Sequence, residues 1–358
     1  MPRAEQAAAA LLRYVLLPFA ANHRGYTFFV LTEKHILEEV ALASNISLLQ
    51  LKPPKQALLR GIWIRTCLFW RQRKCKADLV IQATGNCWSD KSVPQVTFLQ
   101  DYQNGDLRTT KIWQQVMRNA AKHASSYLLI GNTAALHLKA FAADAAFTTL
   151  LPSLLPSLVQ TTSETDPSQI KEIYTGGAEY ILCADAGDLE ADELKLLLKA
   201  YAQFKKRQHT GMKLVLLGAL PENNALAHEI ASYRYRTELV FVDSASTSLE
   251  QSLITAAYAL VDVGFSGHTR FHLLQSLAYA VPVIAPRIPV LEELGEDAFV
   301  FYEACNMEEL AVKMMLLYKD EAFRRQHIRN NQPLRQQTQA TSLFSALDTL
   351  FSSAAKRV

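Results

Sequence analysis

The stretch of this sequence best suited to bind an anion is residues 257–286, AYALVDVGFSGHTRFHLLQSLAYAVPVIAP. Residues 257–263 are an apolar, β-branched run typical of a buried parallel strand, and a glycine-containing turn follows it. Residues 270–280 place apolar side chains at helical spacing, with Thr269 as the expected N-cap, and a second buried strand completes the stretch. The turn is therefore expected at the carboxyl end of a strand, where open α/β sheets bind ligands and helix amides hold anions.

Cationic side chains gather at the start of that helix, namely His268, Arg270 and His272. In one interpretation they bind an anion, with Arg270 donating two hydrogen bonds to a phosphate. In the other they hold no ligand, since cations at a helix N-terminus oppose its dipole. The ligand-binding candidates of this turn and helix are Gly264, Gly267, His268, Thr269, Arg270 and Gln275.

Other chemical motifs are few. The sequence contains no serine nucleophile elbow, no Walker loop and no G-x-G-x-x-G motif. The acidic run 185–193 follows an expected strand, and carboxylates adjacent in sequence are more typical of a solvated loop than of a metal site. We therefore expect neither a metal nor a resident cofactor.

Composition excludes several classes of protein. The chain has 358 residues, of which 49% are apolar and 20% charged, which suits a soluble protein with two cores. A formal charge of +3 is too small to indicate a nucleic-acid partner. Five cysteines without a C-x-x-C pair indicate a reducing compartment rather than a disulfide framework or a zinc site.

Two features bear on export and membranes. No apolar run reaches the roughly 18–20 residues that a membrane span needs. Residues 7–21 have some features of a signal peptide, but Glu5 and the interrupting Arg13 argue against export, because a secretory segment is an unbroken apolar run. We therefore expect a cytoplasmic protein.

A basic aromatic helix is expected at Ala57–Lys76, where Trp63, Phe69 and Trp70 precede the run RQRKCK. Such a helix can lie on an anionic membrane surface, which would make the protein peripheral at the inner face. The alternative is a packed helix whose C-terminal cations favour its dipole. The sequence leaves both interpretations open.

Strand and helix patterns alternate along the chain, which predicts an α/β protein with parallel sheets. The expected strands are 26–31, 46–51, 77–82, 96–99, 127–130, 180–184, 213–217, 238–242, 257–263 and 281–285. The expected helices are 4–21, 57–76, 111–123, 134–142, 193–204, 225–232, 270–280, 307–318 and 342–351. A Pro-, Ser- and Thr-rich stretch ending in two glycines, Leu151–Gly177, is the expected linker.

The stretch 257–286 resembles the donor-site region of the family 4 glycosyltransferases, whose pattern reads roughly S-x-x-E-G-F-G-x-P-x-x-E-A-M-A-x-G-x-P-V-I. Its end is similar residue for residue, at Ala278, Pro282, Val283 and Ile284. The residues that contact the donor differ. Gly267 and Gln275 replace the two glutamates, and His268, Thr269 and Arg270 replace Gly-Phe-Gly.

The resemblance covers nearly the whole chain and implies the retaining, metal-independent GT-B fold, in which two Rossmann-like domains face a cleft. It implies an acceptor-side domain at 1–160, a nucleotide-sugar-side domain at 161–335, and a helix at 336–358 that crosses back to the first domain. The first strand of the fold is not evident, because the chain opens on a helix. Asp192 occupies the place of a phosphate-binding lysine, and no arginine counterpart is evident. The cleft candidates are Gln100, Asp101, Gly131 and Asn132.

Two functions from different classes therefore remain. The first is an atypical transferase of polysaccharide biosynthesis, which moves a sugar from a nucleoside diphosphate to a glycan or lipid-linked acceptor through an altered donor site. The second is a GT-B protein without turnover that binds a glycan, a nucleotide or a partner enzyme. We favour impaired catalysis, since each charged donor contact that can be located has been replaced.

Overall fold

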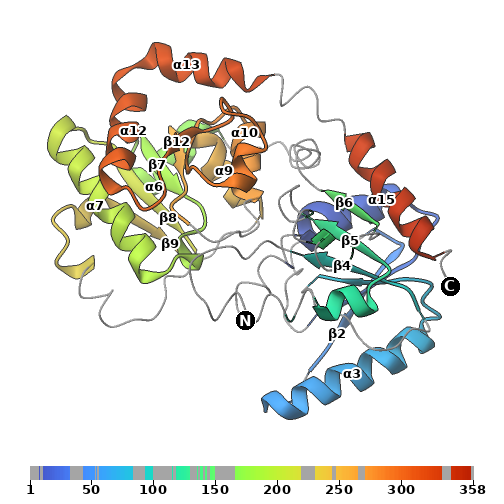
Figure 1. Cartoon of the computed structure of the whole chain (residues 1–358). Helices are drawn as coiled ribbons and strands as arrows, with labels where there is room; N and C mark the ends of the chain where they lie inside the picture. Colours follow the sequence, from blue (N-terminus) through green and yellow to red (C-terminus); the bar gives the residue numbers. More distant parts are fainter. Residues whose placement is uncertain are drawn as a thin grey trace. The chain divides into compact units, whose positions relative to one another are not determined.

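The structure is a computed structural model that describes residues 8, 11–32, 43–52, 54, 56–83, 93–99, 115, 118–129, 135, 138–139, 142, 146–149, 166–218, 230–243, 247–264, 271–332 and 340–355. These residues form two compact units (Figure 1). Unit 1 holds the described residues up to Thr149 together with 340–355, and unit 2 holds those of 166–332.

Unit 2 is built on a six-stranded parallel sheet. Its strands are β7 (Tyr180–Cys183), β8 (Lys213–Leu217), β9 (Leu239–Val242), β10 (Ala259–Val261), β11 (Val283–Pro286) and β12 (Val300–Tyr302). They lie in the order β12-β11-β10-β7-β8-β9. The chain therefore starts at the centre, extends to one side and then returns to the other, which is the doubly wound order with its switch point between β7 and β10.

Helices alternate with these strands. The structure gives α6 (Pro167–Thr175), α7 (Ala191–Gln208), α9 (Thr247–Ala256), α10 (Phe271–Ala278), α11 (Pro289–Glu292), α12 (Met307–Lys319) and α13 (Glu321–Asn330). The apolar face of α7 is buried, including Leu194, Tyr201 and Phe204, as its sequence spacing predicts. Buried residues of α12, such as Leu310 and Met314, join the same core.

The interpretation of Leu151–Gly177 as one linker is wrong for its last part, because Pro167–Thr175 are the helix α6. The Asp166 side chain caps this helix by accepting a hydrogen bond from the Ser168 amide at 3.0 Å, and Pro167 occupies the first turn. Gly176 ends it in the left-handed conformation, with φ of 63°. The two glycines are therefore a helix terminator.

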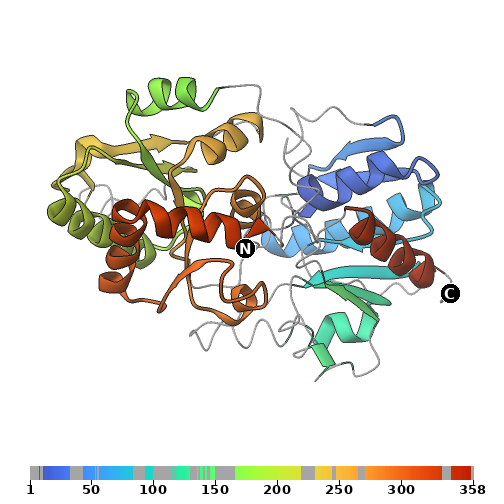
Figure 2. The same ribbon diagram turned by 90° about the horizontal axis from the view of Figure 1, so that it is seen from above.

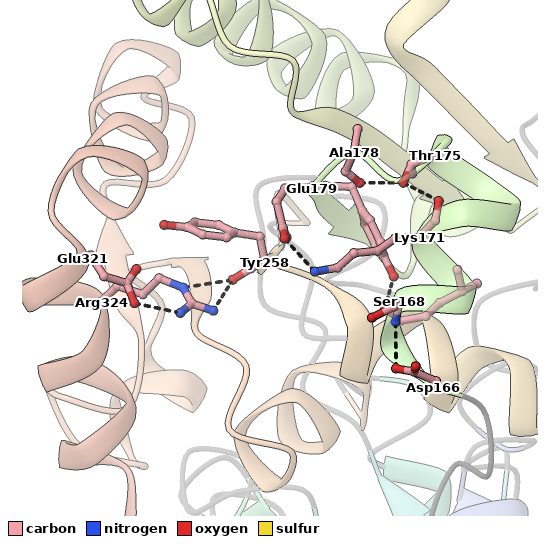
Figure 3. Close-up of polar contacts among 11 residues, drawn as sticks. Asp166, Ser168, Lys171, Thr175, Ala178, Glu179, Tyr258, Glu321 and Arg324 are labelled. Carbon is pink, nitrogen blue, oxygen red and sulfur yellow. Dashed lines mark hydrogen bonds and ion pairs between the residues drawn. The ribbon is translucent and has the colours of Figure 1, made fainter.

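Polar contacts fasten the amino-terminal edge of this sheet, where Glu179 precedes β7 and Tyr258 precedes β10 (Figure 3). Lys171 of α6 pairs with Glu179 at 2.7 Å. Arg324 of α13 donates to the Tyr258 carbonyl at 3.2 Å, and its guanidinium lies 4.4 Å from the centre of the Tyr258 ring. These contacts lie at the edge opposite the strands' carboxyl ends. They therefore do not involve the edge at which a ligand is expected.

Unit 1 contains two separate parallel sheets, which Figure 2 shows in blue and in teal to green. β1 (Phe28–Thr32) pairs with β2 (Ile46–Gln50). The second sheet has the order β3-β4-β5-β6, formed by β3 (Val80–Gln82), β4 (Gln95–Leu99), β5 (Ser126–Leu129) and β6 (Phe147–Thr149). A π-helical turn (Leu12–Leu16) and α2 (Leu17–Asn22) precede β1, and α3 (Ala57–Lys74) precedes β3.

The last helix of the described chain, α15 (Ala340–Ala355), belongs to unit 1. Its Phe344 and Phe351 rings pack edge-on against Phe19 of α2, at centroid distances of 5.8 and 5.4 Å. The Tyr26 hydroxyl, in the turn before β1, donates to the Asp348 carboxylate at 2.7 Å. These contacts join the end of the sequence to its beginning.

Most expected elements in the described ranges are present with shifted boundaries. Only Ala259–Val261 of the expected strand 257–263 pair as β10, because the unpredicted helix α9 extends to Ala256. The helix α3 ends two residues before Lys76. β6, β12 and α13 were also not predicted.

Candidate functional site

The candidate site lies at the switch point of the unit 2 sheet. Asp185 follows β7, and Asp262 and Gly264 follow β10. Because the two strands are parallel neighbours, the segments after them meet at the same edge. This is the edge at which the stretch 257–286 predicted a ligand.

The segment after β10 is held by its own hydrogen bonds. The Gly264 amide donates to the Asp262 carboxylate at 3.0 Å, which forms an Asx-type turn. The Tyr302 hydroxyl of β12 donates to the Asp262 carbonyl at 3.1 Å and fixes the strand end. Gly264 is a predicted ligand contact, and in this structure its amide hydrogen is engaged within the turn.

His272, in the first turn of α10, lies between two carboxylates. Its Nδ1 is 2.6 Å from Asp185 Oδ1, and its Nε2 is 3.9 Å from Glu250 Oε2 on α9. The side chains of His272 and Asp185 are only 17% and 29% exposed, so solvent screens this pairing incompletely. In this arrangement the Nδ1 atom of His272 is engaged by Asp185, and a role of His272 in binding an anion stays a prediction.

Sequence reasoning did not single out Asp185 or Glu250. It treated the run 185–193 as a solvated loop, whereas the structure forms a 3-10 turn at Ala186–Asp188 and then begins α7. The detectable signal was an acidic residue directly after the central strand of the domain, the position from which a side chain reaches the switch point.

Asp192 lies exposed in the first turn of α7, and the neighbouring acids cap the helix. Glu190 and Glu193 form a reciprocal capping box, in which the Glu190 amide donates to Glu193 Oε2 at 2.8 Å. Side chains of the chain itself thus satisfy amides that would otherwise be available to a phosphate, and the added negative charge favours the helix dipole.

Gln275 of α10 is completely buried, with 0% of its surface exposed. Neither its amide nitrogen nor its amide oxygen has a hydrogen-bond partner within the described structure. Leaving a buried polar group unsatisfied costs about 1–3 kcal/mol. The side-chain amide therefore has a donor and an acceptor that make no hydrogen bond within the described structure. This is expected where a ligand or a rearranged neighbour completes the contacts.

Two glycines bring the segments after β7 and β8 into close contact. Gly218 has φ of 110°, and a Cβ added there would lie 2.8 Å from the backbone nitrogen of Gly187. No larger residue fits at Gly218 without displacing that backbone. The main chains at Gly187 and Gly218 thus form the border of the candidate site beside Asp185, which we call the rim.

A third backbone feature ends α10. Ala280 adopts a left-handed conformation, with φ of 64°, at the position where the family 4 pattern has glycine. A side chain in this region is strained relative to glycine. The turn therefore has the left-handed conformation that suits glycine, although alanine stands at this position.

The remaining predicted residues lie outside the described part of the chain: Gly267, His268, Thr269, Arg270, Gln100, Asp101, Gly131 and Asn132. Their roles stay predictions. Within the described ranges, no group of three or more His, Cys, Asp or Glu side chains is arranged to hold a metal ion. No helix in those ranges is long and apolar enough to cross a membrane.

Two units with parallel sheets, one of them in complete doubly wound order, define the GT-B fold. Residues 177–333, in unit 2, match the family model described as "Glycosyl transferases group 1". No curated protein matches the chain.

Solved structures with the same fold include several glycosyltransferases. Sucrose-phosphate synthase of Thermosynechococcus elongatus superposes with a TM-score of 0.76 at 12% identity, over 94% of this chain and 91% of that one. WaaG, a glycosyltransferase involved in lipopolysaccharide biosynthesis, gives 0.73 at 14% identity, over 94% and 95%. HepE of Anabaena, in complex with UDP and glucose, gives the same values as WaaG. At these identities the likeness shows the fold alone.

Proposed function

We propose that this protein is a glycosyltransferase of family 4 type that binds a nucleoside diphosphate sugar at the switch point of unit 2 and transfers the sugar with impaired efficiency. The observation that carries the proposal is the placement of His272 between Asp185 and Glu250. Sugar transfer from such a donor requires stabilisation of the departing diphosphate, which cations normally provide. Here two of the described residues that follow the central strands, Asp185 and Asp262, are carboxylates.

The size of this effect is considerable. Two unit charges 4 Å apart interact by about 4 kcal/mol at the effective dielectric near a protein surface. Replacing a cation by an anion at this distance changes the interaction energy with the phosphate from attraction to repulsion. His272 offsets part of the negative charge, but its ring nitrogens face Asp185 and Glu250 rather than open space.

The buried amide of Gln275 supports retention of a nucleotide-binding role. It stands where the resemblance expects the glutamate that holds the ribose, and an amide can still pair with hydroxyl groups. HepE has the same fold and binds UDP, so a uridine nucleotide is the first donor to test. TarM, another protein of this fold, was solved with α-GlcNAc-glycerol and UDP, and WaaG acts in lipopolysaccharide biosynthesis. We therefore include a glycan or a lipid-linked molecule in the proposal as the acceptor of the sugar.

We include peripheral membrane contact through α3 in the proposal. Trp70 is 71% exposed near the end of this helix, and the neighbouring Arg73 and Lys74 are also exposed. An exposed indole beside cations is a favourable pairing at an anionic lipid interface.

A second function, binding without turnover, is favoured by one further observation. Ala280 keeps a strained conformation at the glycine position of the pattern. The replacement of this glycine by a residue that strains the turn is a further departure from the family pattern, beside Gly267 and Gln275 in place of its two glutamates. Such a protein would bind a glycan, a nucleotide or a partner enzyme.

The experiment that separates these functions is calorimetric titration with UDP, GDP, ADP and their sugar conjugates, followed by a test for sugar release. Binding of one nucleotide with slow release supports impaired transfer. Binding without any release supports the second function. The absence of binding by a protein shown to be folded would refute the transferase proposal and would leave a glycan or a partner enzyme as the ligand of the second function.

A further inference from the structure

The carboxyl-terminal edge of the unit 2 sheet is acidic in the part of the chain that the structure describes. Carboxylates follow several strands within two positions of the strand end, namely Asp185 after β7, Asp243 after β9, Asp262 after β10 and Glu303 after β12. Among the described residues that close to a strand end, the one cation is Arg287, after β11. Its guanidinium pairs with Glu292 at 3.1 Å and with Glu303 at 3.4 Å. The described part of this edge therefore repels a free diphosphate.

Gln275 nevertheless indicates that a ligand binds at this edge. It lies three residues after His272 on α10, so both side chains project from the same side of the helix and lean toward its N-terminus. That direction leads to the place where His272 meets Asp185. The amide of Gln275 is completely buried, and its donor and its acceptor make no hydrogen bond within the described structure. The hydroxyl groups of a nucleotide can satisfy both, whereas a bare metal ion cannot accept a hydrogen bond.

A ligand of this kind fits an acidic edge if it carries a cation of its own. Mg²⁺ binds the oxygens of a diphosphate and is held in proteins by one or two carboxylates together with those phosphates, rather than by a cage of protein ligands. Such a site needs no group of three protein ligands, and the described ranges contain none. The metal ion is then part of the substrate and not a resident cofactor.

We propose that the donor binds to unit 2 as the Mg²⁺ complex of a nucleoside diphosphate, and that Asp185 is the carboxylate that contacts the metal ion or its bound water. Asp185 follows the central strand β7 and its side chain is 29% exposed, so a ligand at the switch point can reach it. Asp262, after the neighbouring strand β10, adds a second negative charge at the same edge. The inference rests on the proposed function and adds to it the ionic form of the substrate.

The contact with His272 is consistent with this role of Asp185. An ionised carboxylate only accepts hydrogen bonds, so the Nδ1 atom of His272 is the donor in the 2.6 Å contact with Asp185 Oδ1. That contact uses one of about four acceptor sites on the two carboxylate oxygens. Carboxylates that bind metal ions are commonly oriented by such a neighbour. His272 is therefore a positioning residue, which holds the Asp185 carboxylate in place for the metal ion.

Calorimetric titration of the full chain with UDP, GDP and ADP tests the inference, once in EDTA and once in excess MgCl₂ with the ionic strength matched by NaCl. For the nucleotide that binds, we expect a dissociation constant about tenfold or more lower with Mg²⁺, because the metal ion replaces repulsion between phosphate and carboxylate by a bridge. Equal affinity in the two buffers would overturn the inference and leave nucleotide binding intact. The absence of binding in both would refute the transferase proposal on which the inference rests. Tight binding of Mg²⁺ without a nucleotide would also overturn it, since the site would then hold a resident metal ion.

The variant Asp185→Asn tests the assignment of the metal contact. In EDTA it should bind the nucleotide more tightly than the wild type, because a repulsive charge is absent, and Mg²⁺ should improve its affinity by less than about threefold. The matched control is Asp243→Asn, which removes an exposed acid at the same edge and should keep the full effect of Mg²⁺. A full effect of Mg²⁺ on Asp185→Asn would overturn the assignment to Asp185.

Discussion

Replacing Asp185 by asparagine should strengthen the binding of UDP. The carboxylate lies at the switch point, 2.6 Å from His272, and the amide of an asparagine at this position can still hydrogen-bond that ring. The substitution therefore removes a negative charge with little change of shape. Among the described carboxylates beside His272 it leaves Glu250, at 3.9 Å, so that less negative charge opposes a phosphate at this place.

The expected gain follows from the geometry. A phosphate oxygen about 4 Å from Asp185 would experience about 4 kcal/mol of repulsion at the effective dielectric near a protein surface. The side chain is 29% exposed and partly neutralised by His272, so we take about half of that value. About 2 kcal/mol corresponds to roughly a thirtyfold lower dissociation constant.

The assay is calorimetric titration with UDP at low and at physiological ionic strength. Asp243→Asn is the matched control, because Asp243 is an exposed acid that follows β9 at the same edge of the sheet, two strands from β7. The gain for Asp185→Asn should shrink as salt is added, while the control stays near the wild type. If both variants bind UDP with the wild-type affinity, the electrostatic reasoning about this site is refuted.

Three further outcomes are expected. Ala280→Gly should stabilise unit 2 by about 0.5–1 kcal/mol in denaturant unfolding, because relief of left-handed strain exceeds the added entropy of the unfolded chain; destabilisation would show that the alanine methyl is well packed. Burial lowers the pKa of His327, so this side chain takes up a proton at a higher pH in the unfolded chain than in the folded protein. The folded protein should therefore lose stability as the pH falls below about 6.5. The variant His327→Gln should lose less between about pH 7.5 and 5.5, and an identical loss would assign the acid sensitivity to other groups. Trp70→Ala should weaken sedimentation with phosphatidylglycerol vesicles several-fold without changing unfolding, whereas unchanged sedimentation would remove α3 from the membrane proposal.

The apolar runs of the sequence were sufficient to predict five of the six strands of the unit 2 sheet, because buried runs such as YILC and KLVLL are typical of parallel strands. The helix α6 was missed although Asp166, Pro167 and Gly176 are its standard boundary residues, since proline and glycine were interpreted as linker signals.

The candidate site was less accessible to sequence reasoning. The contact between Asp185 and His272 joins residues 87 positions apart, and no periodicity encodes which side chains meet across a switch point. The order of the strands within each sheet is likewise a long-range property.

The contact between Gly187 and Gly218 bears on how the candidate site of unit 2 would respond to a ligand. The main chain of Gly218 lies directly against that of Gly187, so the end of β8 and the segment after β7 are packed together at this point. A ligand that enters beside them meets a preorganised rim and loses little free energy to loop ordering. Association at this rim should therefore be limited by diffusional encounter and charge rather than by a conformational step, and its rate constant should change strongly with salt concentration.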